Sequence, residues 1–152
     1  MTETAYVAIG ANLGDAQRAV EDAIAELGRL SRSRLVACSS LYRTAPVDAG
    51  GPDFINAVVA LDTELAPLEL LAHLQAIETA AGRERPYRNA PRTLDLDILS
   101  HGEQELDTPT LTLPHPRMGQ RAFVLVPLAE IAPGRVTAAQ LAAVAGQAIQ
   151  RL

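Results

Sequence analysis

The sequence predicts a single domain of the α+β class that spans residues 1–152. Two observations lead to this prediction: short apolar stretches typical of strands alternate with two amphipathic helix patterns, and the chain is long enough to bury one core. Its hydrophobic content of 48% and charged content of 20% are ordinary for a globular protein. No apolar run approaches the roughly 20 residues that a membrane-spanning helix needs.

The first strand is expected at residues 6–9, and the turn-forming stretch GANLGD follows it. Within that turn, Asn12 or Asp15 is suited to cap the next helix, because both side chains accept hydrogen bonds from a helix N-terminus. Apolar residues then recur at helical spacing over residues 16–30, which predicts an amphipathic helix.

Two further strand patterns precede a second helix. Residues 35–47 and 54–63 form stretches typical of strands. Pro67 then opens the second helix at a favoured first-turn position. The apolar stripe of this helix comprises Leu70, Leu74, Ile77 and Ala81.

The second half of the chain adds one more strand and an extension. A polar loop at residues 82–91 leads into a strand pattern, and a short hairpin is expected around residues 101–105. Residues 137–152 are expected to form a terminal helix. The order strand–helix–strand–strand–helix–strand, with additions at the C-terminus, is typical of the ferredoxin-like fold. We therefore expect an antiparallel sheet with helices packed on one face.

The stretch PRTLDLDILS, residues 91–100, combines a buried strand pattern with two carboxylates. Asp95 and Asp97 share one face of the expected strand, with their Cα atoms roughly 7 Å apart. Two ionised carboxylates at that spacing repel by about 2 kcal/mol at an effective dielectric constant near 20. Mg²⁺ would offset this repulsion, since one or two carboxylates and substrate phosphates usually hold it. A sheet with one wet face is the competing interpretation of so short a pattern.

The charge distribution favours a small polyanionic ligand. All 13 cationic residues are arginines, which excludes a Walker A loop and a Schiff-base lysine. The net charge of −5 argues against a nonspecific nucleic-acid binder. Guanidinium groups match phosphate oxygens in a bidentate geometry. The arginines in the stretch around the two aspartates are Arg83, Arg85, Arg88, Arg92, Arg117 and Arg121.

Three further residues have side chains suited to a flat, polar ligand. Asn56 stands inside an apolar strand pattern, where a buried amide needs hydrogen-bond partners and is able to read both donor and acceptor groups. Phe54 and Phe123 are the two phenylalanines of the chain, and aromatic rings stack on flat ligands. Ordinary core packing is the competing interpretation for each of these residues.

Six stretches of the chain occur in an order that resembles one known family. They run from residue 5 to about residue 133 and read AIGANLGD, SSLYRTAPV, DFINAVVALDT, RTLDLDI, LTLPHPRM and RAFVLVPLAEIAP. The family is that of the 6-hydroxymethyl-7,8-dihydropterin pyrophosphokinases of folate biosynthesis. RTLDLDI followed by LPHPR is highly specific to it.

The resemblance implies a reaction and its ligands. The family transfers the terminal pyrophosphate of ATP to the hydroxymethyl group of the pterin and releases AMP, with two Mg²⁺ ions bound between the aspartate pair and the ATP phosphates. By resemblance, the metal ligands are Asp95 and Asp97, and the catalytic residues are Asp95, Asp97, Arg83 and Arg92. The implied ATP contacts are Gln75, Glu78, Arg83, Arg85, Arg92, Ile98, Thr112, His115 and Arg121. The implied pterin contacts are Thr44, Pro46, Val47, Phe54, Asn56, Asp95 and Phe123.

The chain departs from the family pattern at four positions. Ala90 stands where the family has glycine, and Asn89 follows Arg88 where an aromatic residue is common. Thr110 replaces a basic residue found in some members, and Pro116 replaces an aromatic one. These departures concern loop closure and adenine contacts rather than the reaction.

Two other functions are compatible with parts of the pattern. One is a non-catalytic ferredoxin-like module that binds a metal or a regulator through the aspartate pair. The other is a DxD-type nucleotide-sugar transferase, which the small size and the missing Rossmann pattern disfavour. Cys38 is the single cysteine, and the N-terminus shows no signal peptide, so we expect a cytoplasmic protein. We expect it to act as a monomer on small molecules, without nucleic-acid or membrane partners.

Overall fold

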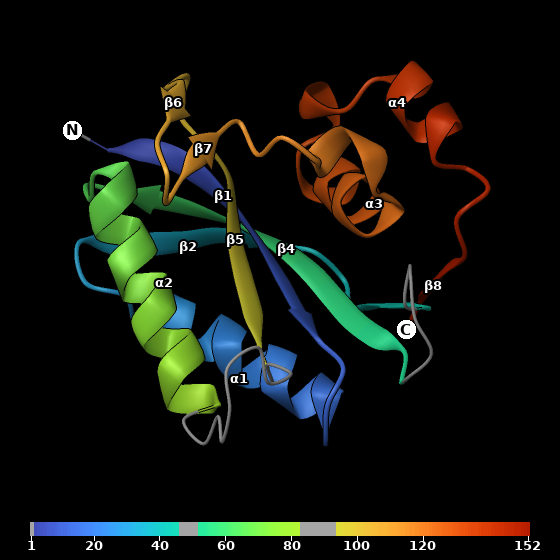
Figure 1. Ribbon diagram of the computed structural model, residues 1–152, viewed down its shortest axis with the longest axis horizontal. Coiled ribbons are helices and arrows are strands. Elements are labelled where there is room, and N and C mark those ends of the chain that lie inside the picture. The colour runs from blue at the N-terminus through green and yellow to red at the C-terminus, as the bar shows by residue number, and fades with distance from the viewer. Residues whose placement is uncertain (1, 46–51, 83–93) are drawn as a thin grey trace.

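The computed structural model describes residues 2–45, 52–82 and 94–152, and it has the expected α+β class (Figure 1). The strands are β1 (Glu3–Ala11), β2 (Ser33–Cys38), β3 (Tyr42–Thr44), β4 (Phe54–Thr63), β5 (Asp95–His101), β6 (Leu106–Asp107), β7 (Thr112–Leu113) and β8 (Ile149–Arg151). The helices are α1 (Ala16–Gly28), α2 (Pro67–Ala81), α3 (Ala122–Ile131) and α4 (Ala138–Ala143), with short 3-10 turns at Met118–Gln120 and Pro133–Arg135.

The main sheet is antiparallel and has the strand order β5-β1-β4-β3-β8, with β2 also paired to β4. Elements β1 to β5 follow the predicted strand–helix–strand–strand–helix–strand order, except that two shorter strands, β2 and β3, replace the single strand expected at residues 35–47. This order places β1 and β4 at the centre of the sheet and β5 at one end of it.

Both predicted helices form, and local capping explains where each begins. The Asp15 side chain accepts a hydrogen bond from the Arg18 N–H at 3.1 Å, so Asp15 caps α1. Pro67 occupies the start of α2 as expected, and the Glu69 carboxylate accepts a hydrogen bond from the Ala66 N–H at 2.9 Å. None of the helices in the described part of the chain is long and apolar enough to cross a bilayer.

Helices cover both faces of the sheet, which corrects the expectation of a single covered face (Figure 1). On one face α1 and α2 pack over a large core. On the other face α3 packs over Ala8, Val58 and Leu99 through Val124 and Leu128. The helix α3 belongs to the C-terminal addition. It does not cover the whole of this sheet face, which stays open near the start of β5.

Two predictions for the C-terminal half are wrong. A hairpin was expected around residues 101–105. Instead β6 pairs with β7, with Leu106 opposite Leu113, so the hairpin turns at residues 108–111. The expected terminal helix over 137–152 is limited to α4, and the chain then extends into β8, which pairs with β3. Edge pairing satisfies the backbone groups of this tail, and sequence periodicity alone does not reveal such a partner.

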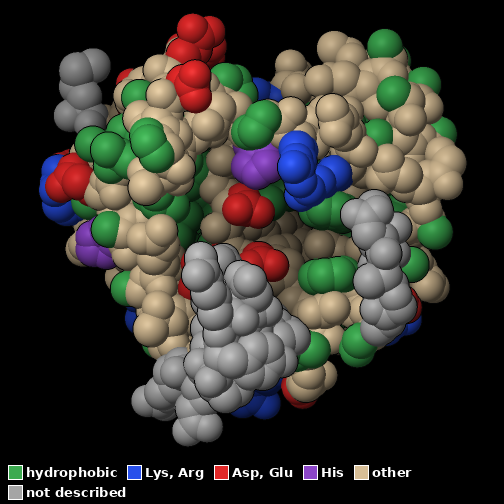
Figure 2. Space-filling model, viewed as in Figure 1, with side chains coloured by type: hydrophobic (Ala, Val, Ile, Leu, Met, Phe, Trp, Pro, Cys, Tyr) green, Lys and Arg blue, Asp and Glu red, His purple; other side chains and the backbone are tan. Residues whose placement is uncertain are grey.

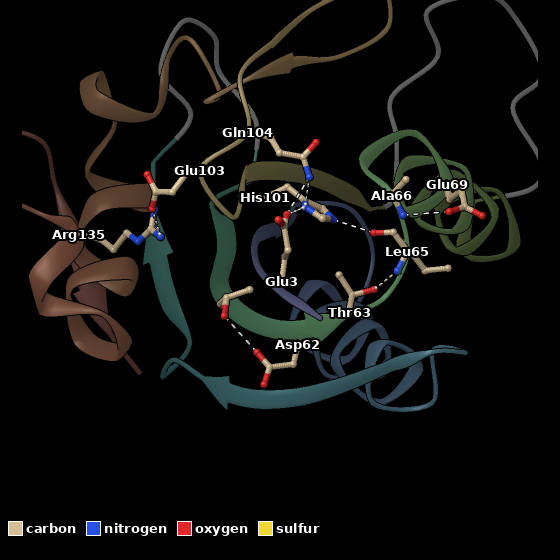
Figure 3. A network of polar contacts seen from close by, with 11 residues as sticks. Glu3, Asp62, Thr63, Leu65, Ala66, Glu69, His101, Glu103, Gln104 and Arg135 are labelled. Atoms are coloured by element: carbon tan, nitrogen blue, oxygen red, sulfur yellow. Dashed lines mark hydrogen bonds and ion pairs between the residues drawn. The ribbon is translucent and has the colours of Figure 1, made fainter. Parts of the chain in front are cut away.

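A buried histidine ties three elements together at the far end of β5 (Figure 3). His101 is 2% exposed, and its Nε2 lies 2.8 Å from the Leu65 carbonyl oxygen that precedes α2. Its Nδ1 lies 3.0 Å from the Glu3 carboxylate on β1, which also accepts a hydrogen bond from Gln104 at 2.8 Å. This network fixes β5 against β1 and α2, at the opposite end of the strand from the two aspartates.

Candidate active site

The alternation of β5 places its two aspartates on the face that α3 only partly covers. Leu96 and Ile98 belong to the core beneath α1 and α2, whereas Leu99 packs beneath α3. Asp95 and Asp97 therefore share a face with Leu99, because successive side chains in a strand point to opposite faces. Asp95 is half-buried and Asp97 is exposed, so both carboxylates lie where the sheet opens to solvent.

The sheet register aligns one residue from each of four strands in a row, and three of the four carry polar side chains. Asp95 lies opposite Gly10, Gly10 lies opposite Asn56, and Asn56 lies opposite Tyr42. Residues directly opposite one another share a face of the sheet. Gly10 contributes no side chain to this row, and a Cβ at its position would lie 3.2 Å from Asn56 Oδ1. The glycine thus leaves space between the aspartate and the asparagine.

The Asn56 side chain is held in one orientation. It is 3% exposed, and its Nδ2 donates a hydrogen bond to Thr44 Oγ1 at 2.8 Å. Thr44 is also buried and comes from β3, opposite Phe54. This pair presents a fixed amide and a hydroxyl at the floor of the uncovered face, which is the kind of polar group that orients a ligand in a pocket.

An aromatic ring and an arginine from the start of α3 face these sheet residues. The Arg121 guanidinium carbon lies 5.3 Å from the centroid of the Phe123 ring, within the range of a cation–π contact. Phe123 and Phe54 are both half-buried, so each ring keeps exposed surface.

The sheet and the start of α3 line an open cavity of about 1010 Å³. Its lining includes the predicted residues Thr44, Phe54, Asn56, Asp95, Asp97, Arg121 and Phe123. Figure 2 shows acidic, histidine and arginine side chains gathered around a hollow on this face of the molecule. A cavity with a few convergent polar groups and aromatic walls is typical of a small-molecule site.

His115 lies near Asp97, Arg117 and Arg121, which line the cavity, and its ring Nδ1 has a partner in the neighbouring main chain. The backbone N–H of His115 donates to the Leu99 carbonyl oxygen at 2.9 Å, and the ring Nδ1 accepts a hydrogen bond from the backbone N–H of Arg117 at 3.2 Å. Burial lowers the pKa of His115, and the charges of Arg121 and Arg117 lower it further, although the Asp97 charge opposes them. With Nδ1 accepting the bond from Arg117, Nε2 is the ring atom left to donate to a ligand.

Several of the residues predicted to contact the nucleotide lie on α2, β5 and β7, within the described part of the chain. Glu78 comes from α2, and its Oε2 accepts a hydrogen bond from the Leu96 N–H at 2.7 Å. Gln75 is exposed on α2, one turn before Glu78, and Thr112 is half-buried on β7. The Ile98 side chain is 2% exposed in the core, so a ligand could reach its main chain but not its side chain. Of the predicted nucleotide residues that the structure describes, Arg121 lines the cavity.

Five predicted site residues lie outside the described residues: Pro46, Val47, Arg83, Arg85 and Arg92. The structure therefore places the aspartate pair, the Asn56–Thr44 pair and the two phenylalanines around one cavity, with His115, Glu78 and Gln75 at or beyond its border.

Sequence reasoning missed several residues that line the cavity. They are Asn12, Gln120, Gln147 and Ala148. Asn12 stands in the turn GANLGD, where the sequence suggested it only as a helix cap. Gln147 gave no signal, because the tail was expected to be helical and its fold depends on contacts with distant residues.

The aspartate pair fits a hard divalent cation that is shared with a ligand. Among residues 2–45, 52–82 and 94–152, no group of three or more His, Cys, Asp and Glu side chains is placed to hold a metal ion. Two carboxylates form an incomplete set of oxygen ligands. Mg²⁺ is often bound in this way, with waters and substrate phosphates completing its coordination.

Comparison with known proteins identifies the family. Residues 6–133 match the family described as 7,8-dihydro-6-hydroxymethylpterin-pyrophosphokinase (HPPK). A relative from Pseudomonas aeruginosa, named 2-amino-4-hydroxy-6-hydroxymethyldihydropteridine pyrophosphokinase, is 50% identical over 100% of this chain and 98% of its own length. A relative of the same name from Haemophilus influenzae is 45% identical over 85% of this chain and 81% of its own length.

A solved structure agrees with the fold. Wild-type HPPK-DHPS from Plasmodium falciparum superposes with a TM-score of 0.66 at 14% identity, over 88% of this chain. The chain spans 38% of that protein's length, and at this identity the likeness concerns the fold alone. The family match and the two close relatives each cover most of the chain. The chain therefore belongs to the 7,8-dihydro-6-hydroxymethylpterin-pyrophosphokinase family.

Proposed function

We propose that this chain transfers the terminal pyrophosphate of ATP to the hydroxymethyl group of 6-hydroxymethyl-7,8-dihydropterin and releases AMP, a step of folate biosynthesis. Family membership supports the reaction, and one structural observation supports its location. The exposed Asp95–Asp97 face opens onto the same cavity as the Asn56–Thr44 pair and the two phenylalanines. A metal-binding group and a site for a flat polar ring thus adjoin, as a transfer between two bound substrates requires.

The reduced pterin is assigned to the floor of the cavity. Phe54 and Phe123 supply ring faces from β4 and α3, and the Asn56 amide offers a donor and an acceptor to the edge of the pterin. Thr44 keeps that amide in one orientation. We assign Pro46 and Val47, which the structure does not describe, to the same substrate.

ATP is assigned to the side of β5. Gln75, Glu78, Thr112, His115 and the main chain of Ile98 lie along or near this strand. His115 offers an Nε2 donor, and Arg121 brings a positive charge to the border between the two substrates. We assign Arg83, Arg85 and Arg92 to the phosphates, although they lie outside the described residues.

Two Mg²⁺ ions are assigned to Asp95 and Asp97 together with the ATP phosphates. When bound, they would neutralise phosphate charge and help to align the attacking and leaving oxygens. In this proposal the whole chain is one catalytic domain that works as a cytoplasmic monomer, without nucleic-acid partners.

Labelled ATP tests this proposal. ATP that carries radioactive phosphorus at the α position should give labelled AMP, and ATP labelled at the γ position should give a labelled pterin diphosphate. Formation of labelled ADP, with a pterin monophosphate, would show that one phosphoryl group is transferred and would refute a pyrophosphokinase reaction. Binding of both ligands without any product would favour a non-catalytic module.

A further inference from the structure

The tail of the chain forms part of the cavity wall. Residues 134–152 follow the stretch that matches the family, and Gln147 and Ala148 line the cavity beside Arg121 and Phe123. None of the roles assigned above uses this tail. Its hydrogen bonds connect it to the start of α3, where Arg121 and Phe123 lie.

The Gln147 side chain bridges two main-chain groups on either side of Arg121. Its Oε1 accepts a hydrogen bond from the Ala122 N–H at 2.9 Å, and its Nε2 donates to the Gln120 carbonyl oxygen at 2.9 Å. Both functions of the amide are thus used within one short segment. This bridge holds the backbone of Arg121 from both sides.

The bridge replaces a helix cap that Arg121 is unable to provide. Arg121 is the N-cap residue of α3, and within the described part of the chain its side chain makes no capping bond. A guanidinium group has donors but no acceptor, so it is not suited to bind the free N–H groups of a helix start. Gln147 Oε1 binds the first of them, at Ala122. The Arg121 guanidinium lies over the Phe123 ring, next to the segment that Gln147 bridges.

The other end of the same tail is fixed to the opposite wall. In β8, Ile149 pairs with Thr44 and Arg151 pairs with Tyr42. The Leu152 N–H donates to the Leu41 carbonyl oxygen at 2.9 Å. Residues 147–152 therefore connect the start of α3 with β3, which are the elements that carry Phe123 and Thr44.

We propose that Gln147 is a positioning residue that sets Arg121 and Phe123 for the two substrates. This inference rests on the proposed function for the identity of the ligands. Because Arg121 is assigned to ATP and Phe123 to the pterin, loss of the bridge weakens the binding of both. Loss of one ring, by contrast, affects the pterin alone.

The test compares Gln147→Ala with Gln150→Ala. Gln150 is an exposed residue of β8, three positions further on, and it does not line the cavity. Calorimetry on each whole protein should show Kd values for reduced pterin and for a non-hydrolysable ATP analogue raised about fivefold to tenfold by Gln147→Ala. Gln150→Ala should leave both within about twofold. Gln147→Glu, which keeps the acceptor and loses the donor, should weaken both ligands as well.

Steady-state kinetics and thermal unfolding separate positioning from a structural role. For Gln147→Ala we expect raised KM values, kcat within about threefold of the wild type, and a melting temperature lowered by only a few degrees. A lower melting temperature with unchanged Kd and KM values would overturn the inference, as would equal losses in Gln150→Ala. If the wild type releases no AMP, the proposed function fails, while the calorimetric comparison still tests Gln147.

Discussion

Asp95 and Asp97 stand in an apolar strand because one of its faces is not fully covered. Leu96 and Ile98 fill the core on the face beneath α1 and α2, and the aspartates face the cavity on the face that α3 partly covers. The strand period alone was enough to place both carboxylates on one face. It did not reveal that Gly10 and Asn56 would lie beside them, since strand pairing decides that.

Asp97→Ala should abolish AMP formation and preserve the fold. Asp97 is exposed, so its loss leaves no buried group unpaired, and it removes one of two like charges. We expect a rate at least about a hundredfold lower at saturating Mg²⁺, with a melting temperature equal to or slightly above that of the wild type. A continuous AMP assay and thermal unfolding measure the two quantities.

Asp107→Ala is the matched control for this variant. Asp107 is an exposed aspartate on β6, away from the cavity lining, and its loss should leave the rate unchanged. If Asp97→Ala turned over at a rate near that of Asp107→Ala, the aspartate pair would not be the metal site.

Phe123→Leu should weaken pterin binding and leave ATP binding nearly unchanged. Leucine keeps most of the apolar volume but removes the ring face, and stacking is worth roughly 0.5–1.5 kcal/mol beyond buried area. We expect the Kd for the reduced pterin to rise roughly threefold to tenfold in calorimetry.

Tyr6→Leu is the control for Phe123→Leu, because it also removes an aromatic ring that contacts an arginine. The Arg135 guanidinium carbon lies 5.2 Å from the Tyr6 ring centroid, yet Tyr6 does not line the cavity. Pterin affinity should stay at the wild-type level in this variant. Equal losses for pterin and the ATP analogue in Phe123→Leu would show that the ring serves the core instead.

At the scale of whole elements, sequence periodicity predicted what is local. The amphipathic patterns of α1 and α2, the Asp15 cap and the Pro67 start all depend on neighbouring residues, and they were right. The β6–β7 hairpin and β8 depend on partners far along the chain, and they were missed. The same reason explains why Gln147 and the position of α3 over the second face escaped prediction.

Gly102→Ala should destabilise the turn after β5. Gly102 has φ +56°, and an added Cβ would lie 2.6 Å from the Glu3 carboxylate, which His101 and Gln104 hold in place. A left-handed conformation costs an ordinary residue roughly 1–2 kcal/mol. A melting temperature lower by about 2–4 °C per kcal/mol is expected in thermal unfolding.

Gly134→Ala provides the comparison, since Gly134 has ordinary backbone angles and open space around its Cβ position. Its melting temperature should match the wild type or exceed it. Equal stability of the two alanine variants would mean that the turn tolerates a side chain.

Glu130 should make the contact between α3 and β3 sensitive to acid. Burial raises the pKa of Glu130, but hydrogen bonds from Tyr42 and Ser40 and the charge of Arg151 outweigh this and lower it below 4.5. The carboxylate therefore contributes stability above pH 4.5, and this contribution is lost as the pH falls through the lowered pKa. Burial, with the Glu130 contact, raises the pKa of Tyr42 to about 12, so its neutral form persists in ordinary buffers.

Melting temperatures between pH 3 and 7 should show this dependence. Glu130→Gln should be less stable than the wild type at pH 7, and the difference should shrink as the pH falls below about 4.5. Glu105→Gln, at an exposed position, should follow the wild type throughout. A constant difference between Glu130→Gln and the wild type across this range would mean that the carboxylate charge has no part in the contact.

At the scale of the whole molecule, the two faces of the sheet have different roles: one carries the main hydrophobic core, and the other carries the candidate active site. The face under α1 and α2 is filled with apolar side chains, and the His101 network anchors the end of β5 remote from the aspartates. The other face is covered by α3 at one part and hollow at another, and β1, β3, β4 and β5 all contribute residues to the hollow. The tail closes this arrangement by joining α3 to β3.

The central claim is that the cavity unites a reduced pterin with metal-bound ATP for one transfer. Rapid-quench measurement of AMP release from ATP, with the pterin or Mg²⁺ omitted in turn, tests it most directly. The account predicts one AMP per pterin diphosphate when all components are present, and no AMP above background when either the pterin or Mg²⁺ is left out. AMP release that continues without the pterin, or in the presence of a chelator that removes Mg²⁺, would contradict it.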